Sequence, residues 1–513
     1  MQNKQDTILT AIIAGDIELK AGQALERLRR ALLSKLTFSN PSWQKQMKRG
    51  VSVEKTPRQR YAFQKLKDGG VRISRGAWKI LLEIAKKHEI EIKWEVNVTT
   101  PEERPLALEL NAELRPYQQD AIDASIKSRG GVIVIPTGGG KTMVAMGLAA
   151  QLKTETLFIV HTRELLRQTV QSVAQFLGIE AGVIGAGKWE PKPFTVALIQ
   201  TLVRRDIEEI KDHFGLIVID EAHHAPAQSY FDVLPYFSAR YRVALTATPY
   251  RKDGLHELLW LQFGDIVYRV HKKDLEEHGR LLTPIVYPIT TNFQYDYNDD
   301  FTSLITALCE NPKRHEIVID TIKYTHRPRG CSLILTERIE HCRKITKSLQ
   351  KEHLPVVMLH GQLSSKVRIA SLESLKNGEA ELLVATLSLI GEGWDHPPLE
   401  TLYLTVPNGN KTKTTQALGR ILRPAPNKPT PRVYDFVDRN VGLLRYHWGI
   451  RGKVYGLTPE ECQSISQPSP TSEKEDILAP PKQELMDMLQ AISQGDFDAA
   501  NSMLQKNKLN NKK

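Results

Sequence analysis

The stretch that decides the fold reads GVIVIPTGGGKT and occupies residues 131–142. Its four apolar residues 132–135 predict a short buried strand, and the glycines that follow lead into a helix-forming run. Glycines let backbone N–H groups curl around a phosphate, and the helix presents its N-terminus to the same negative charge. This order therefore predicts a loop that binds the phosphates of a nucleotide. The expected loop residues are Pro136, Thr137, Gly138, Gly139, Gly140, Lys141 and Thr142.

Two side chains of this loop would carry its chemistry. Lys141 is placed to reach the β- and γ-phosphate oxygens of ATP, and the Thr142 hydroxyl is placed to ligate Mg²⁺. The full loop pattern has glycine where this chain has Ile135. A glycine-rich turn that binds nothing is therefore the alternative for the loop taken alone.

Length and composition limit the class of protein. A chain of 513 residues is too long for one hydrophobic core, and 41% apolar with 25% charged residues is typical of a soluble globular protein. No apolar run approaches the ~20 residues of a membrane span, and the N-terminus lacks the apolar core of a signal peptide. We therefore expect an intracellular protein without membrane contact. The four cysteines show no CxxC spacing, which argues against a zinc ribbon and a disulfide framework.

The excess positive charge is confined to the N-terminal fifth of the chain. Residues 1–100 hold 20 Lys and Arg against 10 Asp and Glu, which leaves the rest of the chain only +1 of the total charge of +11. A segregated basic domain indicates a polyanionic partner, and a solvated basic surface is the alternative. Lys48 and Arg49 lie in the most basic run, shortly after the aromatic residues Phe38 and Trp43, and are expected to contact DNA phosphates.

Alternation of short β-rich runs with helical runs predicts two α/β domains in tandem, each with a parallel sheet. The expected strands are 132–135, 156–160, 196–199, 216–220 and 242–248 in the first series, and 332–336, 356–360, 381–386, 401–406 and 432–437 in the second. Apolar spacing in residues 4–36, broken at Ala14-Gly15-Asp16, predicts two short helices.

The expected domain organisation follows from these patterns. It comprises a basic α+β N-terminal domain (1–105), a first α/β domain (106–285), a second α/β domain (286–457), a flexible linker (458–483) and a short helical tail (484–513). Residues 96–105 read as the connection between the first two domains. The linker assignment rests on a Ser-, Pro- and Glu-rich composition.

Two acids, Asp220 and Glu221, stand at the end of the buried strand LIVID. Asp220 is expected to hold Mg²⁺ through water, and Glu221 to orient or deprotonate the attacking water. Acids at the carboxyl end of a parallel strand lie where an α/β nucleotide site needs them. His223 and His224 suggest a metal site at first sight, but adjacent histidines point in different directions and a third ligand is lacking.

Four segments together resemble motifs I, II, III and VI of the superfamily 2 helicases and translocases. They are PTGGGKT at 136, DEAHH at 220, TATP at 246 and QALGRILRP at 416, in the family's order. The resemblance implies two tandem RecA-like domains, ATP and Mg²⁺ as cofactors, and a nucleic-acid partner. LRPYQQDAI at 114 resembles the adenine-recognising segment, which makes Gln118 the expected reader of the base with Tyr117 or Arg115 beside it; an ordinary amphipathic helix start is the alternative.

Motif VI implies two arginine fingers. Arg420 and Arg423, three residues apart, are expected on one face of a helix, with Gln416 one turn earlier near the γ-phosphate. They would meet ATP held by Lys141 and Asp220 only when the second domain closes on the first.

Weaker elements resemble the motifs that contact the backbone of one strand. HTRELLRQ at 161 and LIQTL at 198 resemble motifs Ia and Ib, and LHGQLS at 359 and VATLSLIGEGWDHP at 384 resemble motifs IVa and V. Trp394, in the last of these, is open to two interpretations, a base-stacking residue or a buried structural one. The resemblance implies DNA contacts by Thr162, Arg163, Gln200, Thr201, Gly361 and Thr386.

The segments TATPYRKDGLHELL, LRPYQ and FSNPSW are similar to the XPB-type and phage UvsW-type DNA helicases. Arg251, Lys252 and Asp253 occupy the position of the Arg-Glu-Asp motif of XPB. Because the middle residue is lysine here, no role is transferred from that motif to this chain. This branch implies a DEAH-box, 3′ to 5′ helicase or branch-migrating translocase in repair, recombination or replication, and a cytoplasmic protein of a bacterium, an archaeon or a phage. Its partner would be single-stranded, forked or branched DNA, and a protein could bind the N-terminal domain or the tail.

Two other functions remain as alternatives. The chain could be the ATP-driven motor of a restriction or defence system that works with a separate nuclease. It could instead be a nucleic-acid-binding regulator that has lost hydrolysis, although intact Lys141, Asp220, Glu221 and Arg423 argue against this.

Overall fold

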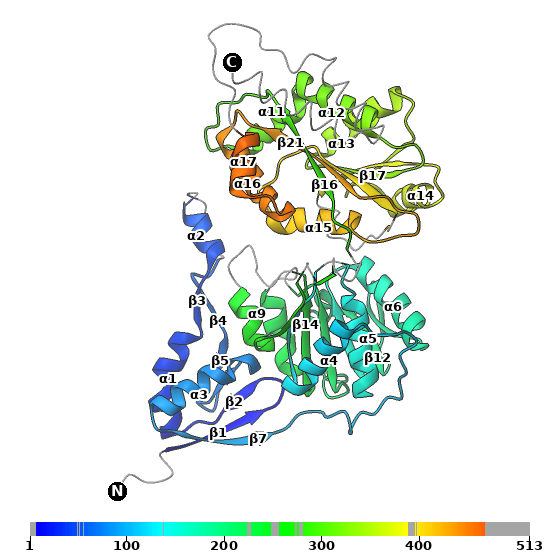
Figure 1. Ribbon diagram of the computed structural model, residues 1–513. Coiled ribbons are helices and arrows are strands. Elements are labelled where there is room, and N and C mark those ends of the chain that lie inside the picture. The colour runs from blue at the N-terminus through cyan, green and yellow to red at the C-terminus, as the bar shows by residue number, and fades with distance from the viewer. Residues whose placement is uncertain are drawn as a thin grey trace. The chain divides into compact units, whose positions relative to one another are not determined.

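The computed structural model describes residues 7–48, 50, 52–54, 56–136, 138–222, 227–247, 256–271, 274–275, 281–387, 396 and 398–466. They form two compact units that meet in the chain between Asp274 and Leu275, ahead of the expected boundary at 285 (Figure 1). The N-terminal domain belongs to the first unit. No helix in these described ranges is long and apolar enough to cross a membrane.

An eight-stranded sheet, in the order β11-β10-β12-β9-β13-β14-β8-β15, forms the core of the first unit. Its strands are β8 (Gly130–Val134), β9 (Thr156–Val160), β10 (Gly182–Gly185), β11 (Lys188–Glu190), β12 (Phe194–Leu198), β13 (Leu216–Asp220), β14 (Tyr241–Thr246) and β15 (Ile266–Arg269). Its helices are α4 (Pro116–Ser128), α5 (Lys141–Leu152), α6 (Arg163–Leu177), α7 (Ile199–Leu202), α8 (Ala227–Val233), η3 (Leu234–Tyr236) and α9 (His256–Phe263).

All five strands expected for this domain are confirmed, as β8, β9, β12, β13 and β14. They pair in parallel and are buried, which explains their near-continuous apolar sequences. Since parallel strands end at one edge of the sheet, the loop after β8 and the acids at the end of β13 are brought to the same side.

The second unit contains a six-stranded parallel sheet in the order β16-β21-β20-β17-β19-β18. Its strands are β16 (Ile285–Thr291), β17 (Cys331–Thr336), β18 (Val356–Leu359), β19 (Leu382–Thr386), β20 (Leu399–Leu404) and β21 (Arg432–Asp438). Its helices are α11 (Phe301–Glu310), α12 (Pro312–Thr325), α13 (Ile339–Lys351), α14 (Ser365–Lys376), α15 (Lys411–Ile421), α16 (Gly442–Tyr455) and α17 (Pro459–Ser466). The five strands expected here are confirmed, and β16 is an addition.

The start of the expected flexible linker is helical instead. Helix α17 packs on α16, where the Trp448 indole donates a hydrogen bond to the carbonyl of Cys462 at 3.1 Å. The linker prediction is therefore wrong for residues 459–466. The rest of the linker and the expected helical tail lie outside the described residues.

The N-terminal domain is a five-stranded mixed sheet, ordered β5-β6-β2-β1-β7, with helices α1 and α3 packed on it. Its elements are β1 (Ile8–Ile13), β2 (Ile17–Leu19), α1 (Gln23–Lys35), β3 (Thr37–Ser39), α2 (Pro41–Lys48), β4 (Gln59–Tyr61), β5 (Phe63–Lys65), β6 (Val71–Ile73), η2 (Arg75–Ala77), α3 (Trp78–Lys87) and β7 (Glu91–Val96). Of the two short helices expected in residues 4–36, the second is confirmed as α1, and the first is wrong because the first apolar run forms a β-hairpin. β1 is rich in β-branched residues and pairs along its whole length with β7, a distant partner that local spacing does not reveal.

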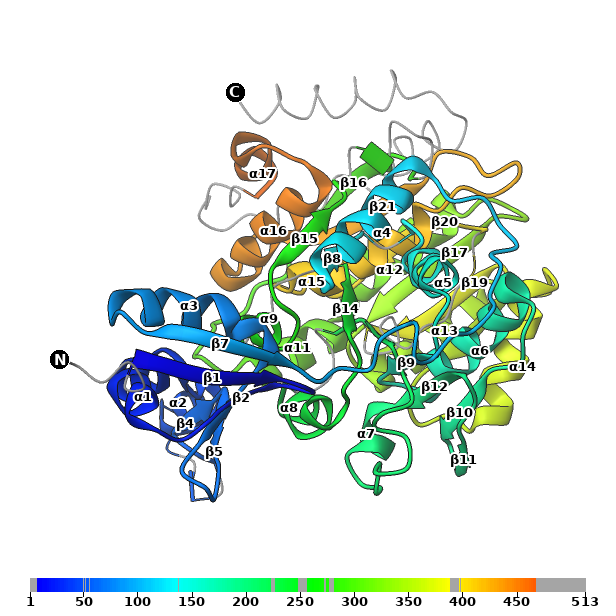
Figure 2. The same cartoon turned by 90° about the horizontal axis from the view of Figure 1, so that it is seen from below.

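The N-terminal domain is joined to the first α/β domain by a buried polar contact. The Arg75 guanidinium donates to the carbonyl of Ala239 at 2.7 Å, and Arg242, 1% exposed, lies 3.4 Å from the Asp16 carboxylate. Burial raises the pKa of Asp16 in spite of the two arginines. Figure 2 shows α3 beside α9, and Leu258 and Leu261 of α9 complete the core of the N-terminal domain. The two domains therefore share one core.

The expected connection at 96–105 is part of the same interface. Thr99 forms a β-bridge with Ala239, and Pro105 forms one with Thr154. Residues 96–105 are thereby held along the first α/β domain.

Gly15 packs closely against the first α/β domain and provides a test of the interface. A Cβ atom at this position would lie 1.7 Å from the Pro235 carbonyl oxygen, a backbone atom that cannot move aside. We expect Gly15→Ala to destabilise the first unit by about 1–3 kcal/mol, the usual cost of overpacking. Thermal unfolding measures this, with Gly449→Ala, which meets nothing within 4 Å, as the control. Equal midpoints for the two variants would contradict the interface.

Candidate ATP site and nucleic-acid interface

The phosphate loop joins β8 to α5 in a conformation that requires glycine. Gly138 and Gly140 have φ values of 88° and 82°, in the left-handed region, and Gly140 is the residue that precedes α5. Lys141 and Thr142 are the first two residues of that helix. The N-terminus of α5 is thereby presented to any group held in the loop. Thr137 lies outside the described residues.

The lysine of the loop meets the acids at the end of β13. Lys141 Nζ lies 2.8 Å from Glu221 Oε1, with side chains only 10% and 18% exposed. Glu221 has a φ of 48°, unusual for a residue with a side chain, and its N–H donates to Asp220 Oδ1 at 2.9 Å. The structure therefore brings together three of the residues that the sequence assigned to one site.

Asp220 lies in an environment that disfavours its negative charge. Burial, followed by the neighbouring charge of Glu221, raises the pKa of Asp220 to about 7, against the opposing effect of Lys141. Two adjacent carboxylates with one lysine leave a net negative charge at the mouth of the loop. A cation bound there would relieve it.

Gln118, the expected base reader, is directed at the phosphate loop. Its side chain is 2% exposed; Oε1 accepts from the Arg115 N–H at 3.0 Å, and Nε2 donates to the carbonyl of Gly139 at 3.2 Å. Tyr117, which the sequence placed beside the base reader, donates to the same carbonyl at 3.0 Å. The start of α4 thus holds one carbonyl of the loop with two side chains.

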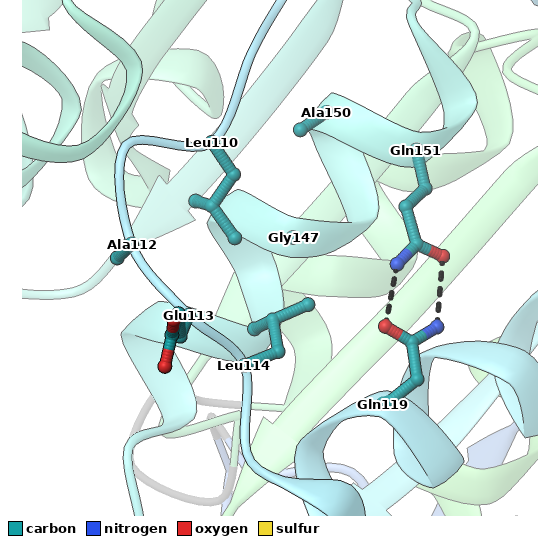
Figure 3. Close-up of a pocket in the computed structure, with 8 residues that line it drawn as sticks. All are labelled: Leu110, Ala112, Glu113, Leu114, Gln119, Gly147, Ala150 and Gln151. Atoms are coloured by element: carbon teal, nitrogen blue, oxygen red, sulfur yellow. Dashed lines mark hydrogen bonds between the residues drawn. The ribbon is translucent and has the colours of Figure 1, made fainter.

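Gln119, the next residue, lines a surface hollow of about 420 Å³ (Figure 3). Its amide and that of Gln151 bond each other reciprocally, at 2.8 and 3.2 Å. The other lining residues are Leu110, Ala112, Glu113, Leu114, Gly147 and Ala150. The one charged residue of this lining is an acid, so the hollow does not suit a phosphate.

Four residues that are expected to contact DNA lie just after the ends of two adjacent β-strands. Thr162 follows β9 and caps α6, where its hydroxyl accepts from the Leu165 N–H at 3.2 Å. Gln200, after β12, donates to the carbonyl of His161 at 2.9 Å. Arg163 and Gln200 are exposed, and Thr201 is half-buried. Because β9 and β12 pair in parallel, these residues share one edge of the sheet.

The expectation that both arginines of motif VI lie on one helix is wrong. α15 ends at Ile421, so Gln416 and Arg420 lie one turn apart on it while Arg423 lies beyond its end. Pro424 explains this, because a residue that precedes proline is disfavoured in the helical conformation. Arg420 is 7% exposed, and Arg423 is half-buried.

Two further residues that are expected to contact DNA, Gly361 and Thr386, differ in exposure. Gly361 is exposed, and its carbonyl accepts from the Arg368 guanidinium at 2.5 Å. Thr386, at the end of β19, is only 4% exposed, which does not favour a direct DNA contact. Several expected positions lie outside the described residues: Arg49, the side chain of Lys48, His223, His224, residues 251–253 and Trp394.

Two protein families match the chain, one in each unit. Residues 111–251 match the family described as type III restriction enzyme, res subunit, and residues 313–425 match the helicase conserved C-terminal domain. The first range holds the phosphate loop and the two acids. The second range holds Gln416, Arg420 and Arg423.

Individual proteins are similar over larger parts of the chain. The DNA 3′-5′ translocase XPB2 of Sulfurisphaera tokodaii is 29% identical over 377 residues, which cover 65% of this chain and 84% of the relative. A fragment of an HsdR subunit of a type I restriction enzyme from Vibrio vulnificus YJ016 superposes with a TM-score of 0.52 at 19% identity, with 66% of each chain covered. The T4 UvsW structure covers 96% of this chain and 97% of its own, with a TM-score of 0.39 at 15% identity.

The matched families agree with the order of the motifs and with the two parallel sheets. The expected fold, two tandem RecA-like domains, is confirmed. The use of ATP and the binding of nucleic acid follow from the family. The two matched families and the similarity to XPB2 together support a superfamily 2 helicase that resembles the XPB-type enzymes.

Proposed function

We propose that this helicase hydrolyses ATP to move 3′ to 5′ along DNA, unwinding it or migrating branches. The observation that carries the proposal is the meeting of Lys141 and Glu221, 2.8 Å apart, at the mouth of the phosphate loop. Lys141 would bind the β- and γ-phosphates, and Glu221 would accept the proton of the attacking water. The direction of movement is taken from relatives named as 3′-5′ enzymes.

The ion pair suggests how an empty site is kept inactive. While Lys141 holds Glu221, the carboxylate is engaged and cannot serve as a base. An arriving triphosphate competes for the lysine, because three negatively charged oxygens near it attract it more strongly than one carboxylate does. Binding would therefore release Glu221 at the point where its proton acceptance is needed.

Mg²⁺ is the proposed metal, held by the Asp220 carboxylate through water and by the Thr142 hydroxyl. Both are oxygen donors, which suit a hard cation. Among the described residues no cluster of three or more His, Cys, Asp or Glu side chains could hold a metal. Such a sparse donor set suits Mg²⁺, which keeps several waters and shares phosphate oxygens. When bound, this ion supplies charge neutralisation for the transferred phosphoryl group.

The DNA grip is proposed to include a projection of the N-terminal domain. Residues 37–61, the basic arm, comprise β3, α2 and β4 and extend from the five-stranded sheet (Figure 1). The arm holds six Lys and Arg residues against one acid, Glu54. Arg58 lies over the ring of Trp43 at 5.5 Å, and Tyr61 is 52% exposed. Cations beside exposed aromatic rings suit the backbone and bases of a nucleic-acid strand.

The proposed function is tested by comparing ATPase rates with single-stranded, duplex, forked and RNA ligands. DNA is expected to stimulate turnover, most strongly in the forked form, and RNA to stimulate it less. A rate that no nucleic acid changes would contradict a translocase and favour a regulator without a motor. Equal stimulation by RNA would contradict a preference for DNA.

The restriction-motor alternative keeps one supporting observation, the name of the family matched by residues 111–251. Co-purification of a nuclease with the full-length chain would favour it. A DEAH-box role in DNA repair and a protein partner for the N-terminal domain or the tail remain part of the main proposal.

Neutralising the basic arm is expected to weaken DNA binding and to lower its salt dependence. Each phosphate contact that is lost should reduce the slope of log K against log salt by ~0.9 on duplex DNA. The variant carries Lys45→Gln, Lys48→Gln, Arg58→Gln and Arg60→Gln, and titrations at several salt concentrations measure the slope. Lys86→Gln with Lys87→Gln, exposed cations on α3, is the control. Unchanged slopes in the arm variant would show that the arm does not touch phosphates.

A further inference from the structure

The start of α4 contacts the phosphate loop through one atom, the carbonyl oxygen of Gly139. Tyr117 Oη lies 3.0 Å and Gln118 Nε2 3.2 Å from it, and both side chains are at most 8% exposed. Arg115 Nη1 in turn lies 2.8 Å from Tyr117 Oη. A guanidinium only donates and a carbonyl only accepts, so the tyrosine hydroxyl must accept from Arg115 and donate to Gly139. The charged donor strengthens the second bond of this relay.

The position of this carbonyl determines where the next amide points. The peptide between Gly139 and Gly140 is planar and trans, so its N–H points opposite to its C=O. With the carbonyl held by Tyr117 and Gln118, the Gly140 N–H is directed away from these two side chains. A Cβ atom on Gly140 would lie 2.4 Å from Gln118 Nε2, which shows how closely α4 covers the other side.

We infer that Tyr117, polarised by Arg115, is a positioning residue for the phosphate loop, and that it acts through the Gly139 carbonyl on the binding of the phosphates of the nucleotide. This inference rests on the proposed ATP site and deepens it. Both polar atoms of the Gln118 amide already have partners within the protein, and its side chain is 2% exposed. The segment that resembles an adenine reader thus sets the direction of a loop amide.

A ligand that lacks the base distinguishes a role of Tyr117 at the phosphates from a role at the base. Tyr117→Phe keeps the buried ring and removes the hydroxyl, and so removes one of two hydrogen bonds to the Gly139 carbonyl. We expect roughly threefold to tenfold weaker binding of Mg-ATP and, by the same factor, of inorganic tripolyphosphate, the range of one hydrogen bond. KM for ATP should rise with little change in kcat, and the thermal midpoint of the nucleotide-free protein should stay within about a degree. A purely structural role would not produce an equal loss on both ligands with an unchanged midpoint.

Two further variants complete the test. Arg115→Ala keeps the hydrogen bond from Tyr117 to the Gly139 carbonyl but removes the charged donor that polarises it. It should produce a smaller loss of affinity, again equal for both ligands. It carries the test alone if Tyr117→Phe does not fold. Gln119→Ala is the matched control on the same helix, because its amide bonds Gln151 and not the loop, and it should change neither affinity.

Two results would overturn the inference: unchanged affinity for both ligands, or a loss confined to ATP, which would assign Tyr117 to the base. Failure of the proposed ATP site looks different. In that case the wild-type protein would bind neither ligand, or Lys141→Ala would bind both as the wild type does.

Discussion

Glu221→Gln is expected to lower DNA-stimulated ATP turnover by a factor of ~10²–10⁴ while leaving ATP bound, the range that a positioned general base supplies. The amide keeps the shape of the side chain but cannot accept a proton from water. It also removes the charge that holds Lys141 at 2.8 Å in the nucleotide-free site. ATP affinity should therefore stay the same or increase. Steady-state ATPase rates and nucleotide titrations on the same preparation measure the two effects separately.

Lys141→Ala is the comparison that separates binding from chemistry. It removes the charge that the β- and γ-phosphates require, so both affinity and turnover should be lost. The two variants break the same ion pair from opposite ends, and only one of them should retain nucleotide. Near-normal turnover by Glu221→Gln with DNA present would show that another group activates the water.

The strands of both motor sheets could be predicted because of how parallel sheets are buried. The central strands are buried on both faces, so β9 and β13 read as nearly continuous apolar runs that no surface helix would show. The phosphate loop and the acids after β13 were predictable for a related reason, since their spacing along the chain is fixed by a short turn next to a strand end.

The N-terminal hairpin was mispredicted because its stabilisation is not local. Residues 8–13 contain apolar positions that fit a helix as well as a strand, and the choice is made by β7, which lies far along the chain. The docking of Gly15 against Pro235 depends on still more distant packing. No pattern within a window of residues carries that information.

Two features of the site differ from the sequence prediction for contrasting reasons. The end of α15 before Arg423 had a visible signal in Pro424. The hydrogen bond that Tyr117 donates to the loop had none, because the sequence placed Tyr117 beside the base, and only the position of the Gly139 carbonyl reveals its hydroxyl as a donor to the loop.

The shared core of the first unit decides how DNA binding can be tested. Removal of the N-terminal domain would leave Arg242, 1% exposed, without the Asp16 carboxylate, and would expose Leu258 and Leu261. Removing the cover of a buried leucine costs roughly 1.5–3 kcal/mol. A truncated motor domain would then lose stability, and its lower activity would say nothing about DNA. Substitutions within the basic arm avoid this, because they leave Asp16, Leu258 and Leu261 in place.

Arg423→Ala is expected to lower DNA-stimulated turnover by ~10³, the scale of an arginine finger, with ATP affinity of the first domain little changed. Arg423 follows the end of α15, where its carbonyl accepts from Lys428 Nζ at 2.6 Å, so its backbone is fixed while the side chain remains half-buried. Arg423→Lys should not restore the rate, because an ammonium lacks the planar fork that spans two phosphate oxygens. Lys411→Ala, an exposed cation at the start of the same helix, is the control and should change the rate little. Normal hydrolysis together with lost DNA binding would place Arg423 on the strand and not at the γ-phosphate.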